Sequence, residues 1–349
     1  MIELASVNVR AGSFQLRDVS VTVERGAWWI ILGPAGAGKT TLLETIAGVR
    51  RIASGTITMR GTDVTAAPPE ARKAGMVYQR GHLFPHLTVA ENIAYGARDA
   101  GLPRELSDRF GVQALEGRGV DALSGGERQV VALVRALATG PDILLLDEPF
   151  SALDPRRRTL VRTELRKMQR EQRLTVLQVT HDFQETGLLG DAALVLEGGR
   201  VAQVGAPSAV FRAPATPSVA EFLGAENIFG GSIVPVEGAD ADGTRTFSFT
   251  GEGLRLVAVG THGGGQGYAV IRAGDITLHV GDAGGGSARN NIEGTIAEIV
   301  DHGVLAQVSI DSAGTRLVAT VTANSVSQLG LAVGGNVIAS IKATAVHLC

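Results

Sequence analysis

The sequence predicts an α/β domain over residues 1–225 followed by a small all-β domain over residues 226–349. In the first part, short continuous apolar runs alternate with helical stretches, which is typical of parallel strands covered on both faces. In the second part, apolar residues alternate with other residues and turns recur at intervals of roughly ten residues, which indicates antiparallel strands. The charge changes too: the second part has 6 Lys and Arg against 11 Asp and Glu, whereas the first has 26 against 24.

The parallel strands of the first domain are predicted by four apolar runs. These runs are residues 27–32, 143–146, 175–180 and 192–196. One helix is expected over residues 39–47, because Gly48 follows it and glycine favours helix C-caps. Another begins at Pro155 and runs to about residue 172, since proline is favoured in the first turn. A third is expected over residues 128–138.

Alternating runs in the second domain predict an antiparallel sheet with one buried face. They lie at residues 296–300, 305–310, 317–322 and 337–342. Strands of this length and spacing build a small sandwich or barrel, and we expect an OB-like barrel.

The composition argues against several classes of protein. The net charge of −3 gives no general attraction for nucleic acid, so no nucleic-acid partner is expected. Cys349 is the single cysteine, which excludes a disulfide framework and a cysteine-based metal site. No apolar run approaches the ~20 residues needed to span a bilayer. The first residues lack a basic segment followed by an apolar one, so no signal peptide is expected.

A phosphate-binding loop is predicted at residues 33–40, which match the pattern G-x-x-x-x-G-K-[ST] between a strand and a helix. Its backbone N–H groups and the helix N-terminus attract phosphate oxygens. We expect Lys39 to reach the β- and γ-phosphates of ATP and Thr40 to hold Mg²⁺. The alternative is a glycine turn with a surface lysine. The expected nucleotide contacts here are Gly33, Pro34, Ala35, Gly36, Ala37, Gly38, Lys39, Thr40 and Thr41.

An acidic pair, Asp147 and Glu148, follows the apolar run at residues 143–146. A strand can deliver the first carboxylate to a metal ion and the second to the attacking water. We therefore expect Asp147 to be a Mg²⁺ ligand and Glu148 to be the catalytic base. The alternative is a solvated strand end, which the loop upstream disfavours.

A second glycine-containing turn, Ser124-Gly125-Gly126, precedes a predicted helix. Alone it is a weak signal, because such turns are common. Between a phosphate-binding loop and an acidic strand end, it resembles the signature motif of the ATP-binding subunits of ABC transporters. Leu123 to Glu127 is a variant of that motif, which usually ends in glutamine. The resemblance covers residues 1 to about 225.

Further landmarks occur in the family's order. Gln79 resembles the Q-loop, residues 151–154 the D-loop, and His181 the switch histidine. The resemblance implies that Gln79 contacts the metal or the water, and that His181 contacts the γ-phosphate. It also implies nucleotide contacts from Ser124, Gly125, Gly126, Glu127 and Asp154.

The family resemblance implies several partners. Two copies of the chain would pack head to tail, so that the loop of one and the signature of the other enclose each ATP. A transmembrane permease would contact residues 80–96, and an extracytoplasmic binding protein would deliver the substrate. The chain would then lie at the cytoplasmic face of the inner membrane as a peripheral subunit.

The sequence departs from the family pattern in three places. Arg10 or Ala11 stands where an aromatic residue usually stacks on adenine, and Phe14 is the nearest aromatic residue. The alternative is that Phe14 is a core residue. Val130 replaces a usual arginine, and the helical subdomain looks short.

The second domain resembles the TOBE/Mop-type modules that bind molybdate. The resemblance rests on Ser287-Ala-Arg-Asn290, Gly294 and Ile341-Lys-Ala-Thr344. A tetrahedral oxyanion needs hydroxyl and N–H donors with one or two cations. The expected ligands are Ser287, Arg289, Thr322, Lys342 and Thr344. The alternative is that this segment is an ordinary strand entry and Lys342 a solvated residue.

The expected function is ATP hydrolysis that powers molybdate or tungstate uptake, with a C-terminal domain that senses the oxyanion. The same motor could instead serve sulfate, ferric iron or polyamine import. Two other classes are a soluble ABC-type ATPase acting on nucleic acid or ribosomes, and a passive oxyanion store. The single phosphate-binding loop, the lack of heptads and the single cysteine disfavour the first class, and the complete ATPase motif set disfavours the passive store.

Overall fold

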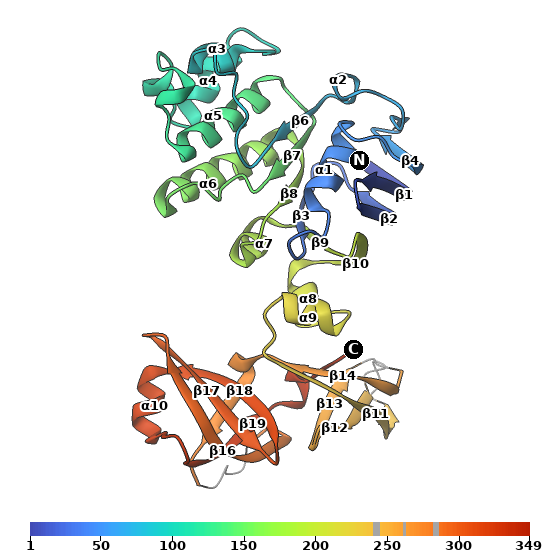
Figure 1. Ribbon diagram of the computed structural model, residues 1–349, viewed down its shortest axis with the longest axis vertical. Coiled ribbons are helices and arrows are strands. Elements are labelled where there is room, and N and C mark those ends of the chain that lie inside the picture. The colour runs from blue at the N-terminus through green and yellow to red at the C-terminus, as the bar shows by residue number, and fades with distance from the viewer. Residues whose placement is uncertain (240–244, 261–262, 282–285) are drawn as a thin grey trace. The chain divides into compact units, whose positions relative to one another are not determined.

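The chain forms two compact units, residues 1–210 and 211–349, in the computed structural model (Figure 1). The structure describes residues 1–239, 245–260, 263–281 and 286–349. The division lies before residues 211–225, which the change in composition assigns to the first domain. Residues 211–225 belong to the second unit because helix α9 (Pro217–Phe222) packs against its strands β11 (Asn227–Ala239) and β14 (Gly265–Ile271). Arg272 of that unit also donates a hydrogen bond to the carbonyl of Phe211.

A six-stranded sheet forms the centre of the first unit, in the order β10-β9-β3-β8-β7-β6. Its strands are β3 (Trp28–Leu32), β6 (Ala74–Val77), β7 (Ile143–Asp147), β8 (Thr175–Val179), β9 (Ala192–Glu197) and β10 (Arg200–Gly205). All neighbours are parallel except β10, which is antiparallel to β9. Every residue of β3, β7 and β8 is buried, which explains why these strands are continuous apolar runs.

A second, antiparallel sheet of the first unit has the order β2-β1-β4-β5. Its strands are β1 (Ile2–Ala11), β2 (Phe14–Val23), β4 (Ser54–Met59) and β5 (Thr62–Asp63). This sheet was not predicted from the sequence. One apolar cluster joins this sheet to the parallel sheet and to α1, with Ile2, Leu43 and Leu145 among its members.

The helices of the first unit confirm most of the expected bounds. They are α1 (Lys39–Ala47), α2 (Pro69–Arg72), α3 (Val89–Ala94), α4 (Leu102–Arg109), α5 (Gly125–Ala138), α6 (Pro155–Gln172) and α7 (Phe183–Leu189). Helix α8 (Pro207–Arg212) begins in the first unit and ends in the second. Gly48 caps α1 in the left-handed conformation, as predicted. The prediction for α5 was wrong at its start: the helix begins at Gly125, because Ser124 and Glu127 form a capping box. Helices α3, α4 and α5 pack together as the helical subdomain.

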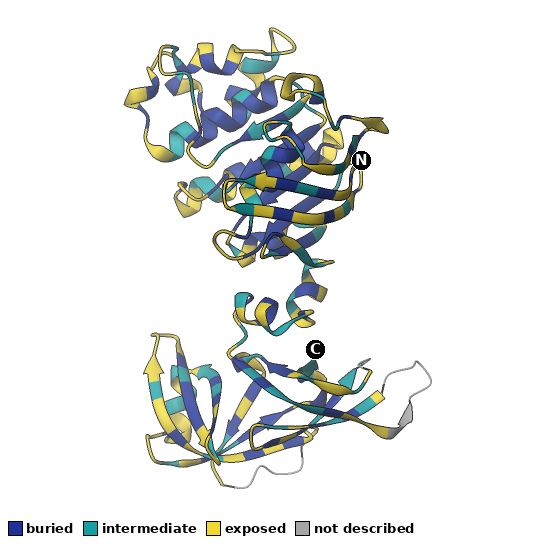
Figure 2. Ribbon diagram, turned by 45° about the vertical axis from the view of Figure 1, so that its right-hand side comes forward, coloured by how far each residue is buried: buried dark blue, intermediate teal, exposed yellow. Residues whose placement is uncertain are grey.

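The second unit is all-β, as predicted, with two five-stranded sheets in which all pairings are antiparallel. The first sheet contains β11 (Asn227–Ala239), β12 (Arg245–Gly251), β13 (Leu254–Gly260), β14 (Gly265–Ile271) and β20 (His347–Leu348). The second contains β15 (Ile276–His279), β16 (Asn290–Asp301), β17 (Leu305–Ser312), β18 (Thr315–Thr322) and β19 (Asn336–Ile341), with helix α10 (Ala323–Leu329) after β18. Buried and exposed residues alternate along these strands (Figure 2). One apolar cluster joins both sheets, which gives the curled, OB-like barrel expected from the alternating runs.

Helix α1 depends on a buried arginine at its C-terminal end. Arg72 is 2% exposed, and burial lowers the pKa of its guanidinium. It donates hydrogen bonds to the carbonyls of Thr45 and Ile46 in the last turn of α1. It also donates to the carbonyls of Ala67 and Thr65. Arg72 therefore ties the helix that follows the phosphate-binding loop to the chain before β6.

We predict that Arg72→Met destabilises the first unit by about 3 kcal/mol, because it leaves buried carbonyls without donors. Urea unfolding measures the loss. The exposed Arg51→Met is the matched control and should change stability by less than about 0.5 kcal/mol. Equal stabilities of the two variants would contradict the structural role of Arg72.

Candidate nucleotide-binding site

The parallel register brings the predicted motifs to one edge of the sheet. Ile31 of β3 and Asp147 of β7 both pair with Val179 of β8. The residues that follow these strands therefore lie together. A cavity of about 440 Å³ occupies this edge. It is lined by Ala11, Phe14, Gly36, Gly38, Lys39, Thr40, Thr41, Arg50, Gln79, Asp147, Glu148 and Val179.

The phosphate-binding loop requires glycine at two of its positions. Gly33 and Gly38 have φ of 148° and 101°, which L side chains rarely adopt. A Cβ on Gly33 would lie 2.2 Å from the carbonyl oxygen of Leu196, and one on Gly38 would lie 2.5 Å from the ring of Phe14. The backbone can therefore curl in front of α1, and Gly36, Gly38, Lys39 and Thr40 line the cavity.

Lys39 crosses the loop that precedes it. Its Nζ donates to the carbonyl oxygens of Gly33 at 2.7 Å and Pro34 at 3.0 Å. Burial lowers the pKa of the ammonium, which Glu148 and Asp147 partly oppose. The ammonium group of Lys39 thus lies beside the loop, in the lining of the cavity.

Thr40 and Asp147 bind each other across the cavity, with the hydroxyl 2.7 Å from Oδ2. Asp147 is 7% exposed, and burial raises the pKa of its carboxyl. A hydroxyl and a carboxylate are hard oxygen ligands, and Mg²⁺ prefers such ligands together with water and phosphate oxygens. These two residues therefore fit a Mg²⁺ ion.

Glu148 adopts a strained backbone conformation, with φ of 48°. Non-glycine residues persist there only where the surroundings hold them, and such positions concentrate at functional sites. Its N–H donates to the carbonyl of Val179 at 3.0 Å. Its carbonyl accepts from Nε2 of Gln129 at 3.1 Å and from the hydroxyl of Ser151 at 3.0 Å.

The side chain of Glu148 meets the two other predicted catalytic residues. Gln79 Nε2 donates to Oε2 at 2.9 Å, and His181 Nδ1 lies 3.3 Å from Oε1. The structure thus brings Gln79, Glu148 and His181 together although they are far apart in the sequence.

The signature residues lie elsewhere in the unit. Ser124 and Glu127 cap α5 and do not line the cavity of their own chain. Gly126 has a role that the sequence analysis missed: a Cβ there would lie 2.8 Å from the carbonyl oxygen of Ala152. The first turn of α5 therefore packs directly on the D-loop.

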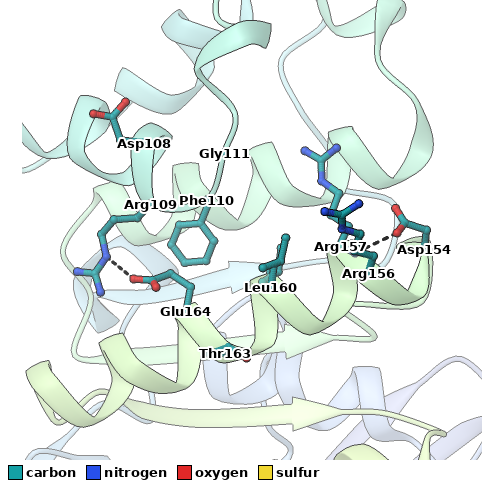
Figure 3. A pocket seen from close by; sticks show the side chains of 11 residues that line it. Asp108, Arg109, Phe110, Gly111, Asp154, Arg156, Arg157, Leu160, Thr163 and Glu164 are labelled. Carbon is teal, nitrogen blue, oxygen red and sulfur yellow. Dashed lines mark hydrogen bonds and ion pairs between the residues drawn. The ribbon is translucent and has the colours of Figure 1, made fainter.

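Asp154 caps α6, where its carboxylate accepts from the N–H of Arg157 at 2.9 Å (Figure 3). It does not line the cavity beside the phosphate-binding loop but a second one of about 540 Å³ between α4 and α6. Arg109 of α4 forms a 2.5 Å ion pair with Glu164 there and another with Glu171. These pairs join the helical subdomain to α6, and no motif indicates them.

Phe14 lines the phosphate cavity and packs against the apolar cluster under Gly38. Ala11 also lines the cavity, whereas Arg10 is exposed and does not. Phe14 therefore contacts both the apolar cluster and the cavity.

The expected oxyanion residues are only partly brought together. Ser287 and Lys342 line a cavity of about 380 Å³, but Arg289 and Thr344 do not. Thr322 does not either, and instead caps α10 by accepting from the N–H of Ser325. The sequence analysis missed the other polar lining residues, which are Asp275, Thr277, His279, Asn291 and Ser340.

Comparison with known proteins identifies the family. The pattern of the ABC transporter family matches residues 16–151, and that of the TOBE domain matches residues 286–348. The molybdate/tungstate import ATP-binding protein WtpC of Pyrococcus horikoshii is 37% identical over 100% of this chain and 99% of its own length. The chain belongs to the ABC transporter family. It is an ABC-type ATPase with a C-terminal TOBE domain.

Other members of the ABC transporter family are also similar. The spermidine/putrescine import ATP-binding protein PotA of Rubrobacter xylanophilus is 38% identical, over 91% of this chain and 85% of its own. The solved post-hydrolysis dimer of the ATP-binding cassette MJ0796, bound to ADP and Pi, is 27% identical with a TM-score of 0.55. It covers 59% of this chain and 99% of its own. Within its described ranges, the ABC-type ATPase has no helix that combines the length and apolar character needed to cross a bilayer.

A buried polar network lies beside His181 of this ABC-type ATPase. Glu185 is 3% exposed and accepts from Gln178 Nε2 and from the Thr180 hydroxyl, both at 2.8 Å. Thr180 in turn accepts from the N–H of Asp182 at 3.1 Å. The network therefore fixes the residues on both sides of His181. The sequence signal for it was Gln178, a polar residue within an apolar run.

We predict that Glu185→Gln flattens the pH dependence of stability. Burial raises the pKa of Glu185, so the folded state binds this proton more tightly than the unfolded state does. The resulting stabilisation is present below the ordinary glutamate pKa and is lost as the pH rises through the raised one. The melting temperature of the variant relative to wild type should therefore rise from about pH 4 to about pH 8.

Circular dichroism over that pH range measures this difference. The exposed Glu70→Gln is the control for the loss of a carboxylate. A difference between Glu185→Gln and wild type that stays constant over the pH range would show that Glu185 does not titrate as inferred.

Proposed function

We propose that this ABC-type ATPase powers the uptake of molybdate or tungstate through a separate transmembrane subunit. The observation that carries the motor part is the meeting of Lys39, Thr40, Asp147, Glu148 and His181 at one sheet edge. The similarity to a molybdate/tungstate import protein over the whole chain supports the cargo.

The loop and Lys39 would bind the β- and γ-phosphates of ATP, because its N–H groups and the ammonium supply positive potential there. Thr40 and Asp147 would hold Mg²⁺, which neutralises charge on the phosphate oxygens. The hydrogen bond of Gln79 orients the Glu148 carboxylate. Glu148 would then accept a proton from the attacking water, while His181 contacts the γ-phosphate.

Each ATP would be enclosed by two copies of the chain. Ser124, Gly125 and Gly126 lie at the N-terminus of the 14-residue helix α5, where the dipole favours an anion. They do not line the cavity of their own chain, so they are free to serve the ATP of a second copy. The γ-phosphate would then hold the dimer together, and its release would open it.

Residues 80–96 would contact the transmembrane permease. The rings of Phe84 and Tyr95 lie 4.4 Å apart, and the Arg135 guanidinium lies 4.9 Å from the Phe84 ring. Buried Asn92 bonds both the N–H and the carbonyl of Phe84. Tyr95 is 58% exposed. The segment therefore offers a fixed aromatic surface to a permease at the cytoplasmic face of the inner membrane. An extracytoplasmic binding protein would deliver the cargo to the other side of that permease.

We predict that Glu148→Gln reduces kcat at least about 100-fold while preserving ATP binding, because it removes the base and keeps the shape. Trapping of the ATP-bound dimer, measured by sedimentation with ATP and Mg²⁺, should increase. Lys39→Ala should instead weaken ATP binding. Multiple turnover at the wild-type rate in Glu148→Gln would contradict the catalytic role.

The TOBE domain would sense the imported oxyanion. Lys342 supplies a cation, and Ser287 and Thr277 supply hydroxyl donors around one cavity. Its His279 could add a further donor. This local cluster would have to overcome the net charge of −5 over residues 226–349.

We predict that the full chain binds molybdate and tungstate, and that Lys342→Ala weakens this binding at least about tenfold through loss of a charge-assisted hydrogen bond. Isothermal titration with molybdate, tungstate, sulfate and spermidine measures it. Arg289→Ala is the matched control outside the cavity and should bind like wild type. Equal effects of the two variants, or binding of sulfate or spermidine alone, would contradict the proposed sensing.

A further inference from the structure

Helix α5 contacts the catalytic glutamate of its own chain through Gln129. Gln129 lies one turn after the signature residues and is 2% exposed. Its Nε2 donates to the carbonyl of Glu148 at 3.1 Å. This carbonyl belongs to the residue in the strained left-handed conformation.

The contact between α5 and the acidic strand end is broader than this hydrogen bond. Gly126 packs on the carbonyl of Ala152, so closely that a Cβ would lie 2.8 Å away. Leu153, which follows, is 4% exposed. The first turns of α5 and residues 148–153 therefore form one packed body. A displacement of the N-terminus of α5 must displace the backbone of Glu148 or break the Gln129 bond.

The groups that fix the Glu148 backbone differ in origin. The carbonyl of Val179 belongs to the neighbouring strand, and Ser151 lies three residues further along the chain. Gln129 comes from the helical subdomain, across 19 residues of sequence. The hydrogen bond of Gln129 thus connects the helical subdomain to the backbone of Glu148.

We propose that Gln129 is a positioning residue that couples the two ATP sites of the dimer. The inference rests on the two-chain site of the proposed function. In that arrangement, the signature turn of one chain contacts the γ-phosphate bound by the second copy. Gln129 then links this contact to Glu148, which acts on the ATP of its own chain. Binding of ATP at one site thereby determines the position of the Glu148 carboxylate at the other site.

The test is steady-state ATP hydrolysis by Gln129→Leu. Loss of one hydrogen bond should lower kcat about tenfold, with KM for ATP within about twofold of wild type. The Hill coefficient should fall from a wild-type value between 1 and 2 to 1. Gln129→Met, which keeps the length of the side chain and lacks the donor, should behave in the same way if Gln129→Leu does not fold.

Gln169→Leu is the matched control. Gln169 is also 2% exposed and also donates from Nε2 to a backbone carbonyl, that of Gly26, and it lies in α6 rather than α5. It should lose stability but keep the wild-type Hill coefficient. A wild-type Hill coefficient of 1, or the same kinetic change in Gln169→Leu and Gln129→Leu, would overturn the coupling. Absence of ATP hydrolysis by the wild-type chain would instead overturn the proposed function.

Discussion

The parallel pairing of β3, β8 and β7 is the constraint on which the candidate site depends. Because Ile31 and Asp147 share Val179 as their partner, the phosphate-binding loop, the acidic pair and His181 must follow at the same sheet edge. A shift of the register by one residue would turn each buried side chain of these strands to the opposite face of the sheet, where it would meet different neighbours. The hydrogen bond between Thr40 and Asp147 then joins the loop to β7.

Much of this architecture could be predicted from the sequence, because chemistry and geometry leave local signals there. Glycine is required at Gly33 and Gly38 by close approach, and apolar runs follow from burial on both faces. The buried supports were not predictable in the same way. Arg72 and Gln129 act through partners 27 and 19 residues away, and Glu185 acts through partners seven and five residues before it. Each looks like an ordinary polar residue of a helix. Even Gly126, which the signature motif suggested as a phosphate contact, is required by its packing on Ala152.

In the second unit, residue types alone did not predict which side chains line one cavity. Its alternating strands were predictable, because one face packs into a single apolar cluster. The set of oxyanion residues was less predictable, because the strand register decides which residues share a cavity. Ser287 and Lys342 share one, but Thr322 serves as a helix cap and Arg289 lies outside. The pairing of Asn291 with Ser340 between β16 and β19 explains why those two line the same cavity.

The central claim is that each ATP is bound by the loop of one chain and the signature of another. Mixing two defective chains, Lys39→Ala and Ser124→Phe, tests it most directly. A mixed dimer would contain one intact site, formed by the loop of the second variant and the signature of the first. The account predicts that each variant alone is inactive and that the mixture regains ATP hydrolysis. If the mixture forms dimers and stays inactive, the two-chain site is contradicted.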